Sequence, residues 1–245
     1  MAAAPANGKK APSSPAKNPE SRSKIIALDF GGQYAHLLCR RVRELNVYSE
    51  LMLPTASTQE LRKAAGIILS GGPSSVYDAD APQFNPEIFT LGIPVLGLCY
   101  GQQLIGQEMG GKVEPGAVKE YGSASLTPAG GKLFAGLPKK FTVWMSHGDK
   151  VSKLPQGFVR TASSGDCENA AIANDAKKIY GLQFHPEVTH TEHGMKILSN
   201  FVFGVCGCKA DWTMKDYLEM KLAETRKLAA GKKVFLLLSC GVDSA

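Results

Sequence analysis

The stretch Ile93-Pro94-Val95-Leu96-Gly97-Leu98-Cys99-Tyr100-Gly101-Gln102-Gln103 decides the fold expected for this chain. Its first half, residues 93–98, is the short apolar run typical of a strand that is buried on both faces of a sheet. Gly97 and Gly101 then flank Cys99 in the G-x-C-x-G spacing of a nucleophile elbow, where a strand turns sharply into a helix. The glycines are needed because such a turn leaves no room for side chains. We therefore predict a strand, a strained turn with a cysteine at its apex, and a helix.

Two roles are open to Cys99 at this point. At the start of a helix, the dipole and the free N–H groups favour the thiolate, which is the reactive form of cysteine. Free cysteine is also among the residue types that are most often buried for structural reasons alone. The stretch by itself leaves both interpretations open.

Segments around this stretch repeat the alternation of strand and helix. Predicted strands cover residues 25–28, 47–53, 66–69 and 95–98, and predicted helices cover 37–45, 61–65 and 102–109. Strands that alternate with helices through short loops indicate a doubly wound α/β fold with a mainly parallel open sheet. Ligands of such sheets bind at the carboxyl ends of the strands. Gln33, the Gly71-Gly72 turn and Cys99 all fall at that edge.

The pattern changes after residue 113, where shorter strands indicate an antiparallel extension of the sheet. The remaining predicted elements are strands over 123–126, 141–145, 158–162 and 179–184, a helix over 195–203, a linker over 204–210, a helix over 213–230 and a strand over 234–238. We expect three parts: a disordered tail over residues 1–23, one domain over 24–208, and the start of a second domain over 209–245.

Composition narrows the class of protein. The chain has 245 residues, 44% of them apolar, which is typical of a soluble globular protein. No apolar run is long enough to span a membrane and no signal-like segment opens the chain, so we expect a cytoplasmic protein with its six cysteines reduced. The formal charge is +6, but five basic residues and one acidic residue within 1–24 carry +4 of it. The rest is nearly neutral, so no nucleic-acid partner is expected.

A partner for the cysteine follows the strand over 179–184. His185 ends that strand and Glu187 lies two residues further on, with Pro186 stiffening the backbone between them. Side chains at i and i+2 of an extended segment point the same way, so the carboxylate can hold the imidazole. A lone histidine is usually a satisfied polar residue, but here it follows a cysteine elbow. Cys99, His185 and Glu187 are therefore the candidate catalytic triad.

An oxyanion hole needs backbone N–H groups that face the developing charge. Tyr100, the residue after the nucleophile, supplies one in elbows of this type. Gly72 of the Gly71-Gly72 pair is the candidate for the second, because glycine permits close approach of the backbone. A plain turn is the alternative interpretation of the glycine pair.

Other polar residues give weaker signals. His190, Glu192 and His193 lie close together in sequence, but the segment has no further ligands, so no metal site is predicted. Cys206 and Cys208 are too close for the usual C-x-x-C pattern of redox or zinc sites.

Together these motifs resemble the class I (triad) glutamine amidotransferases, over roughly residues 24–208. The motifs that carry the resemblance are Gly97-Leu98-Cys99-Tyr100-Gly101-Gln102-Gln103, Ser70-Gly71-Gly72-Pro73 and Gln183-Phe184-His185-Pro186-Glu187. Four more are similar to the GMP synthetase branch of that family: Asp29-Phe30-Gly31-Gly32-Gln33-Tyr34, Arg40-Arg41-Val42-Arg43-Glu44, Ser74-Ser75-Val76-Tyr77 and Ser146-His147-Gly148-Asp149. The resemblance implies a flavodoxin-like fold.

The resemblance also implies a reaction and further site residues. Cys99 would attack the carboxamide of glutamine to form a thioester, and His185 would protonate the departing ammonia. Gln103, Ser146 and His147 would bind the substrate. No cofactor is implied for glutamine hydrolysis itself.

In the GMP synthetase branch, an ATP pyrophosphatase domain follows and opens with the motif S-G-G-V-D-S. The matching loop here is Ser239, Cys240, Gly241, Val242, Asp243, Ser244 and Ala245, with Cys240 in place of the first glycine. The resemblance implies that the complete enzyme uses ATP and Mg²⁺ to aminate XMP with the ammonia. We expect this chain to lack the body of that domain.

Two alternatives stay open from the sequence. One is an inactive amidotransferase-like module with a regulatory role, and the other is a hydrolase of a different γ-glutamyl substrate. The phosphate-type loop over 239–245 argues against the second.

Overall fold

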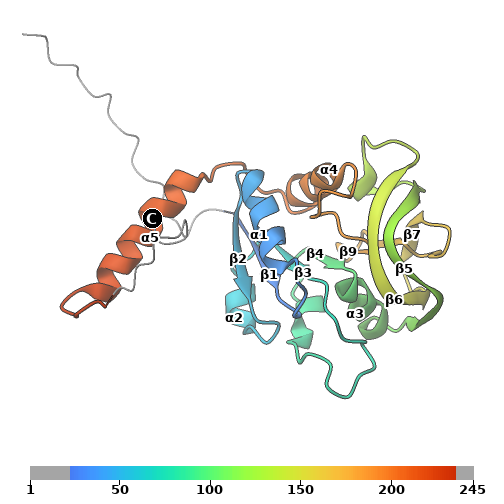
Figure 1. Cartoon of the computed structure of the whole chain (residues 1–245), viewed down its shortest axis with the longest axis horizontal. Coiled ribbons are helices and arrows are strands. Elements are labelled where there is room, and N and C mark those ends of the chain that lie inside the picture. Colours follow the sequence, from blue (N-terminus) through green and yellow to red (C-terminus); the bar gives the residue numbers. More distant parts are fainter. Residues whose placement is uncertain (1–22, 236–245) are drawn as a thin grey trace, which may run out of the picture.

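The computed structural model describes residues 23–235 and builds them around one nine-stranded sheet (Figure 1). The strand order is β2-β1-β3-β4-β9-β8-β7-β5-β6. In that order the strands are β2 (Tyr48–Met52), β1 (Lys24–Leu28), β3 (Gly66–Leu69), β4 (Val95–Leu98), β9 (Ile179–Leu182), β8 (Ala171–Asn174), β7 (Val159–Ser163), β5 (Lys112–Pro128) and β6 (Phe141–Lys153). The first five are parallel and the last four antiparallel.

Two hydrophobic cores lie on opposite faces of the parallel strands, which is the signature of a doubly wound sheet. Alternation along β1 shows this, because Ile25 and Ala27 enter one core while Ile26 and Leu28 enter the other. The first core is covered by α1 (Ala35–Glu44), α4 (Gly194–Ser199) and a π-helix, η4 (Asn200–Val205). The second is covered by α2 (Thr58–Leu61), η2 (Pro86–Phe89) and α3 (Tyr100–Glu108). The predicted α/β fold with a parallel sheet and an antiparallel extension is confirmed.

The antiparallel half differs from the sequence prediction. Strands β5 and β6 run for 17 and 13 residues and pair with each other, whereas only short segments at 123–126 and 141–145 were expected. Their pairing contains irregular registers, which break the simple alternation on which the prediction relied. Strand β8 was missed because three of its four residues are alanine or asparagine, which are depleted in strands.

Two predicted helices differ clearly from the expected bounds. The helix expected over 61–65 is α2, which begins earlier because Ser57 and Glu60 form a capping box at its start. The helix expected over 195–203 is α4 continued by η4. Two short 3-10 helices, η2 and η3 (Lys132–Phe134), were not predicted.

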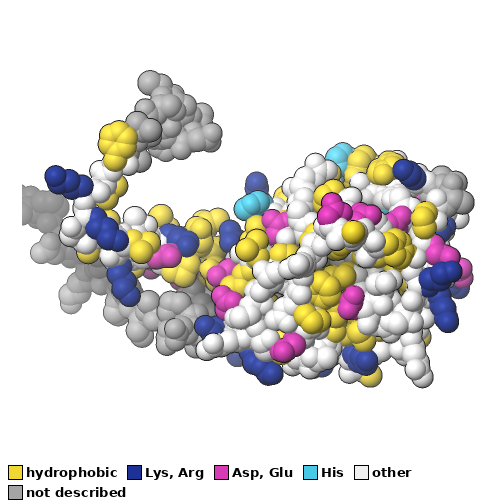
Figure 2. Space-filling view, turned by 90° about the horizontal axis from the view of Figure 1, so that it is seen from below, with side chains coloured by type: hydrophobic (Ala, Val, Ile, Leu, Met, Phe, Trp, Pro, Cys, Tyr) yellow, Lys and Arg dark blue, Asp and Glu magenta, His cyan; other side chains and the backbone are white. Residues whose placement is uncertain are grey.

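Helix α5 (Met214–Ala229) projects away from the sheet, as Figure 1 shows, and buries none of its residues. Thr213 caps it with a hydrogen bond from the backbone N–H of Asp216. Several of its apolar side chains are exposed, namely Met214, Leu218, Leu222 and Leu228, and Figure 2 shows hydrophobic side chains along this projection.

Three predictions fall outside residues 23–235. These are the tail over residues 1–23 except for its last residue, most of the strand over 234–238 and the phosphate-type loop over 239–245. They remain predictions, as does the division of the chain into parts.

The elbow glycines permit a test of the fold. A Cβ added at Gly97 would lie 2.3 Å from the carbonyl oxygen of Gly101, and backbone at both positions is fixed by the sheet and helix. We expect Gly97→Ala to destabilise the chain by about 3 kcal/mol, the upper end of overpacking costs. This corresponds to a melting temperature lower by about 6–12 °C in a domain of this size.

Gly165→Ala is the matched control, because a Cβ there meets nothing within 4 Å. Its melting temperature should stay close to that of the parent chain. Equal melting temperatures for the two variants would contradict the close approach at the elbow.

Candidate active site

Cys99 lies at the junction between β4 and α3, as the elbow motif predicted. Its backbone has φ +50° and ψ −104°, a conformation that a residue with a Cβ rarely adopts. The backbone is held in place because its N–H donates to the Leu182 carbonyl at 2.7 Å and its own carbonyl accepts from the N–H groups of Gln102 and Gln103. The thiol is almost fully buried and donates to the Ser146 carbonyl at 3.4 Å.

His185 and Glu187 meet directly behind β9. The imidazole Nδ1 lies 2.8 Å from Glu187 Oε1, and both side chains are buried. The backbone around them is fixed because Thr191 Oγ1 donates to the His185 carbonyl and Arg41 Nε donates to the Glu187 carbonyl. The structure therefore brings together the two residues that their i, i+2 spacing was expected to align.

The charge state of His185 follows from its neighbours. Burial alone lowers the pKa of His185, but hydrogen bonds to Cys99 and Glu187 outweigh burial and raise that pKa to about 10. The raised pKa favours the imidazolium at neutral pH, and its Nδ1–H donates to the Glu187 carboxylate. His185 therefore carries a proton in the same pocket as Cys99.

The glycine pair after β3, Gly71-Gly72, lies next to the side chains of His185 and Cys99. A Cβ on Gly71 would sit 3.0 Å from His185 Cε1 and 3.7 Å from Cys99 Cβ, so a side chain there would crowd the imidazole. Gly72 packs against the Phe30 backbone and the Tyr100 ring and also lines the pocket at Cys99. Ser70 fixes the turn, since its hydroxyl accepts from the Phe30 N–H and donates to the Gly71 carbonyl. The oxyanion roles of Gly72 and Tyr100 stay predictions.

A pocket of about 320 Å³ opens in front of the sulfur. It is lined by Gly31, Gly32, Gln33, Tyr34, Gly71, Gly72, Pro73, Cys99, Ser146 and His185. The Tyr34 ring approaches His185 edge-on, with ring centroids 5.1 Å apart. Sequence reasoning placed only Gln33 of the turn after β1 at this edge and missed the roles of Gly31, Gly32 and Tyr34 as lining residues. Their position directly after a parallel strand is the sequence feature that could have identified them as lining residues.

A second pocket, of about 420 Å³, adjoins the first at Cys99 and Ser146. Gln103 and His147 line it, together with Asp149. Gln103 Nε2 donates to the Asp149 carbonyl at 2.8 Å, and His147 Nδ1 lies 3.1 Å from the same oxygen. These two side chains thus fix the segment that carries Ser146, and their substrate-binding role stays a prediction.

The other ring nitrogen of His147 faces Glu120, which sequence reasoning missed. Its Nε2 lies 2.9 Å from Glu120 Oε2, and burial lowers the pKa of His147 although the carboxylate opposes that shift. Cys167 lies beside this pair and is fully buried. The sequence carries no signal for the contact, because Glu120 and His147 are paired across two long strands.

The segment with His190, Glu192 and His193 is used for packing. Glu192 Oε2 accepts from the Thr142 N–H, while the rings of His190 and His193 lie against Trp144 and Phe141. These three residues do not converge on a common point. Among residues 23–235, no helix is long and apolar enough to cross a membrane.

The fold and this site define a class of protein, and comparison with known proteins agrees. Residues 26–205 match the family model described as glutamine amidotransferase class-I. The chain therefore belongs to the class I glutamine amidotransferases.

Its named relatives narrow the class further. The chain is 54% identical over 226 residues to a GMP synthase [glutamine-hydrolyzing] of Lactobacillus gasseri, and 52% identical over 228 residues to that of Enterococcus faecalis. These matches cover 91% and 92% of the chain but 44% of each relative, so the chain spans less than half of their length.

A solved structure is similar over nearly its whole length. A putative GMP synthase subunit from Thermoplasma acidophilum superposes with a TM-score of 0.68 at 30% identity, covering 82% of this chain and 98% of that one. The chain is thus a glutamine amidotransferase domain homologous to part of the GMP synthases.

Proposed function

We propose that this chain hydrolyses glutamine to glutamate and ammonia, with Cys99 as nucleophile, His185 as acid and base, and Glu187 as the residue that orients His185. The observation that carries the proposal is the junction of β4 and α3, which holds Cys99 at φ +50° in a pocket against the hydrogen-bonded His185–Glu187 pair. A strained cysteine beside an oriented histidine is the arrangement of an activated nucleophile.

The first half of the reaction forms a covalent intermediate. The Cys99 sulfur attacks the carboxamide carbon as the thiolate, with the His185 imidazolium holding the proton, and the carbonyl oxygen becomes negatively charged. The backbone N–H groups of Gly72 and Tyr100 are proposed to stabilise that charge. The C–N bond then breaks, His185 gives its proton to the departing nitrogen, and ammonia and a glutamyl thioester result.

The second half consumes water. His185, now neutral, takes a proton from a water molecule as the oxygen attacks the thioester carbon. The C–S bond breaks, glutamate leaves and Cys99 is restored. Glu187 Oε1 keeps the same imidazole nitrogen bonded throughout, so the other nitrogen faces the reacting atoms in both halves.

Substrate binding is proposed for the two adjoining pockets. The carboxamide would lie in the pocket at Cys99, and the amino-acid end of glutamine would extend past Ser146 toward Gln103 and His147 in the second pocket. The shared lining residues Cys99 and Ser146 make such a continuous path possible.

The ammonia is proposed to serve a synthetase domain. Relatives named GMP synthase are more than twice as long as the matched region, and this supports an ATP pyrophosphatase domain as the partner, with XMP and ATP as its substrates and Mg²⁺ as its metal. Residues 209–245 are proposed to lead into that domain. The proposed ATP-binding loop lies outside residues 23–235.

Glutamine hydrolysis is tested directly by measuring products. Purified chain incubated with glutamine should release ammonia and glutamate in equal amounts, and release should saturate with glutamine. A γ-glutamyl peptide and asparagine serve as comparison substrates. Faster turnover of the γ-glutamyl peptide, or no product from glutamine at high enzyme concentration, would contradict the proposal.

A further inference from the structure

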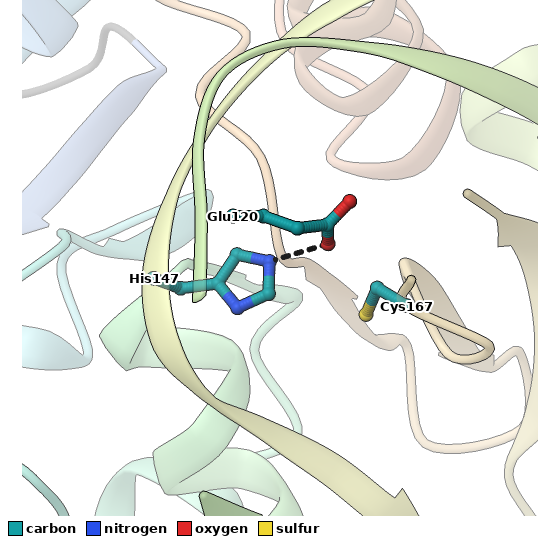
Figure 3. Close-up of side chains that lie close together, drawn as sticks. All are labelled: Glu120, His147 and Cys167. Carbon is teal, nitrogen blue, oxygen red and sulfur yellow. Dashed lines mark hydrogen bonds and ion pairs between the residues drawn. The ribbon is translucent and has the colours of Figure 1, made fainter. Parts of the chain in front are cut away.

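Glu120, His147 and Cys167 form a cluster, of which only His147 has a part in the proposed function, as a lining residue of the second pocket. Glu120 lies on β5, His147 on β6, and Cys167 on the loop between β7 and β8. Figure 3 shows the three side chains converging from these separate elements. Their exposed fractions are 9%, 4% and 0%, so the cluster belongs to the interior.

The partners of the two ring nitrogens of His147 decide which nitrogen carries the hydrogen and which accepts. The Asp149 carbonyl only accepts, so Nδ1 must be the donor in that contact. In the neutral ring, Nε2 then presents a lone pair toward Glu120 Oε2 at 2.9 Å. Two lone pairs that face one another at this distance need a proton or a cation between them.

The third group completes a ligand set. One oxygen of Glu120, His147 Nε2 and Cys167 Sγ all lie within 4.8 Å of one another. Ligand atoms around one zinc ion lie about 3–4 Å apart, since each bond is about 2.0–2.3 Å long. A movement of about one ångström therefore brings the three atoms to bonding distance. Carboxylate and thiolate together neutralise a divalent cation, while imidazole is its common neutral ligand.

The surroundings support these residues as ligands. A histidine that binds a metal usually donates its other N–H to a carbonyl or carboxylate, as His147 does to Asp149. A ligating carboxylate is usually hydrogen-bonded too, and Ser164 Oγ donates to Glu120 Oε1 at 3.1 Å. A surface pocket of about 390 Å³ is lined by Glu120 and by Gly165 and Asp166 next to Cys167, which provides an entry path.

We propose that Glu120, His147 and Cys167 bind a divalent cation of the zinc class, with water as the fourth ligand. The ion takes the place of the proton between His147 and Glu120, and the proton of the Cys167 thiol is released on binding. The site is connected to the proposed catalytic centre, because His147 follows Ser146, whose carbonyl accepts from the Cys99 thiol.

Cobalt(II) is the probe, because cobalt bound to a thiolate gives a charge-transfer absorption. The titration uses Cys99→Ala as the parent, so that the catalytic thiol cannot be the ligand. We expect one Co²⁺ per chain with the thiolate absorption, displaced by Zn²⁺. Adding Cys167→Ala should remove the absorption, and adding Cys39→Ala, which changes another buried thiol, should leave it.

Glu120→Gln provides a second variant, because it retains the shape of the side chain and removes its charge. We expect it to weaken Zn²⁺ binding by at least roughly tenfold, the least that altering a metal site typically costs. If Cys167→Ala does not fold, the Glu120→Gln comparison decides the proposal. The proposal is overturned if the parent shows no thiolate absorption, if the absorption survives Cys167→Ala, or if Glu120→Gln binds Zn²⁺ as tightly as the parent.

Discussion

Replacing Cys99 by alanine is expected to lower the rate of glutamine hydrolysis by roughly 10⁴-fold or more, the usual cost of removing a triad nucleophile. It should also abolish covalent labelling by a glutamine-like electrophile such as diazo-oxo-norleucine. The reason is position: Cys99 alone among the five described cysteines starts a helix within a pocket, next to the His185–Glu187 pair. Intact-mass analysis and peptide mapping measure the adduct.

Cys39→Ala and Cys208→Ala are matched controls, because both thiols are buried away from the pocket lining. Each should keep the adduct and the rate of the parent chain. The assignment is wrong if the adduct persists in Cys99→Ala or maps to another cysteine.

His185→Ala and Glu187→Gln are expected to reduce glutamine hydrolysis to different extents. The histidine change should cost about 10⁴-fold or more, and the glutamate change roughly ten to a hundred times less, because His185 moves the proton whereas Glu187 orients the ring. Glu187→Gln should also change the pH dependence of the hydrolysis rate. The Glu187 carboxylate raises the pKa of His185, so removing its charge lowers that pKa. The limb of the pH–rate profile that reflects titration of His185 therefore shifts to lower pH.

Glu192→Gln is the control for the glutamate change. Glu192 follows the same strand and accepts a hydrogen bond from the Thr142 N–H, but it does not line the pocket. Its rate and pH profile should match the parent. Full activity in His185→Ala, or an unshifted limb in Glu187→Gln, would show that the acid–base role lies elsewhere.

The parallel half of the fold could be predicted because local pattern and tertiary environment agree there. Residues 66–69 and 95–98 are buried on both faces, so a continuous apolar run is what each strand requires. The elbow predicted the backbone strain of Cys99, and the spacing of His185 and Glu187 predicted their contact. Each inference used residues near one another in sequence.

The antiparallel half depends on contacts that sequence spacing does not encode. Strand β6 alternates buried and half-exposed residues over only part of its length, and its pairing with β5 shifts register. Glu120 and His147 meet only because this pairing places them on adjacent strands. The family resemblance predicted that Gln103 and His147 bind substrate, and this stays a prediction. Their shared contact with the Asp149 carbonyl had no signal in the sequence.

The backbone conformation of Cys99 has an evolutionary consequence. Glycine would adopt φ +50° without steric cost, whereas a residue with a Cβ is held there at a cost of about 1–3 kcal/mol. Selection for stable folding and selection for the thiol therefore act in opposite directions at this one position. A gene copy released from the need for the thiol would gain stability if glycine replaced the cysteine, so this position should be among the first to change to glycine in such a lineage.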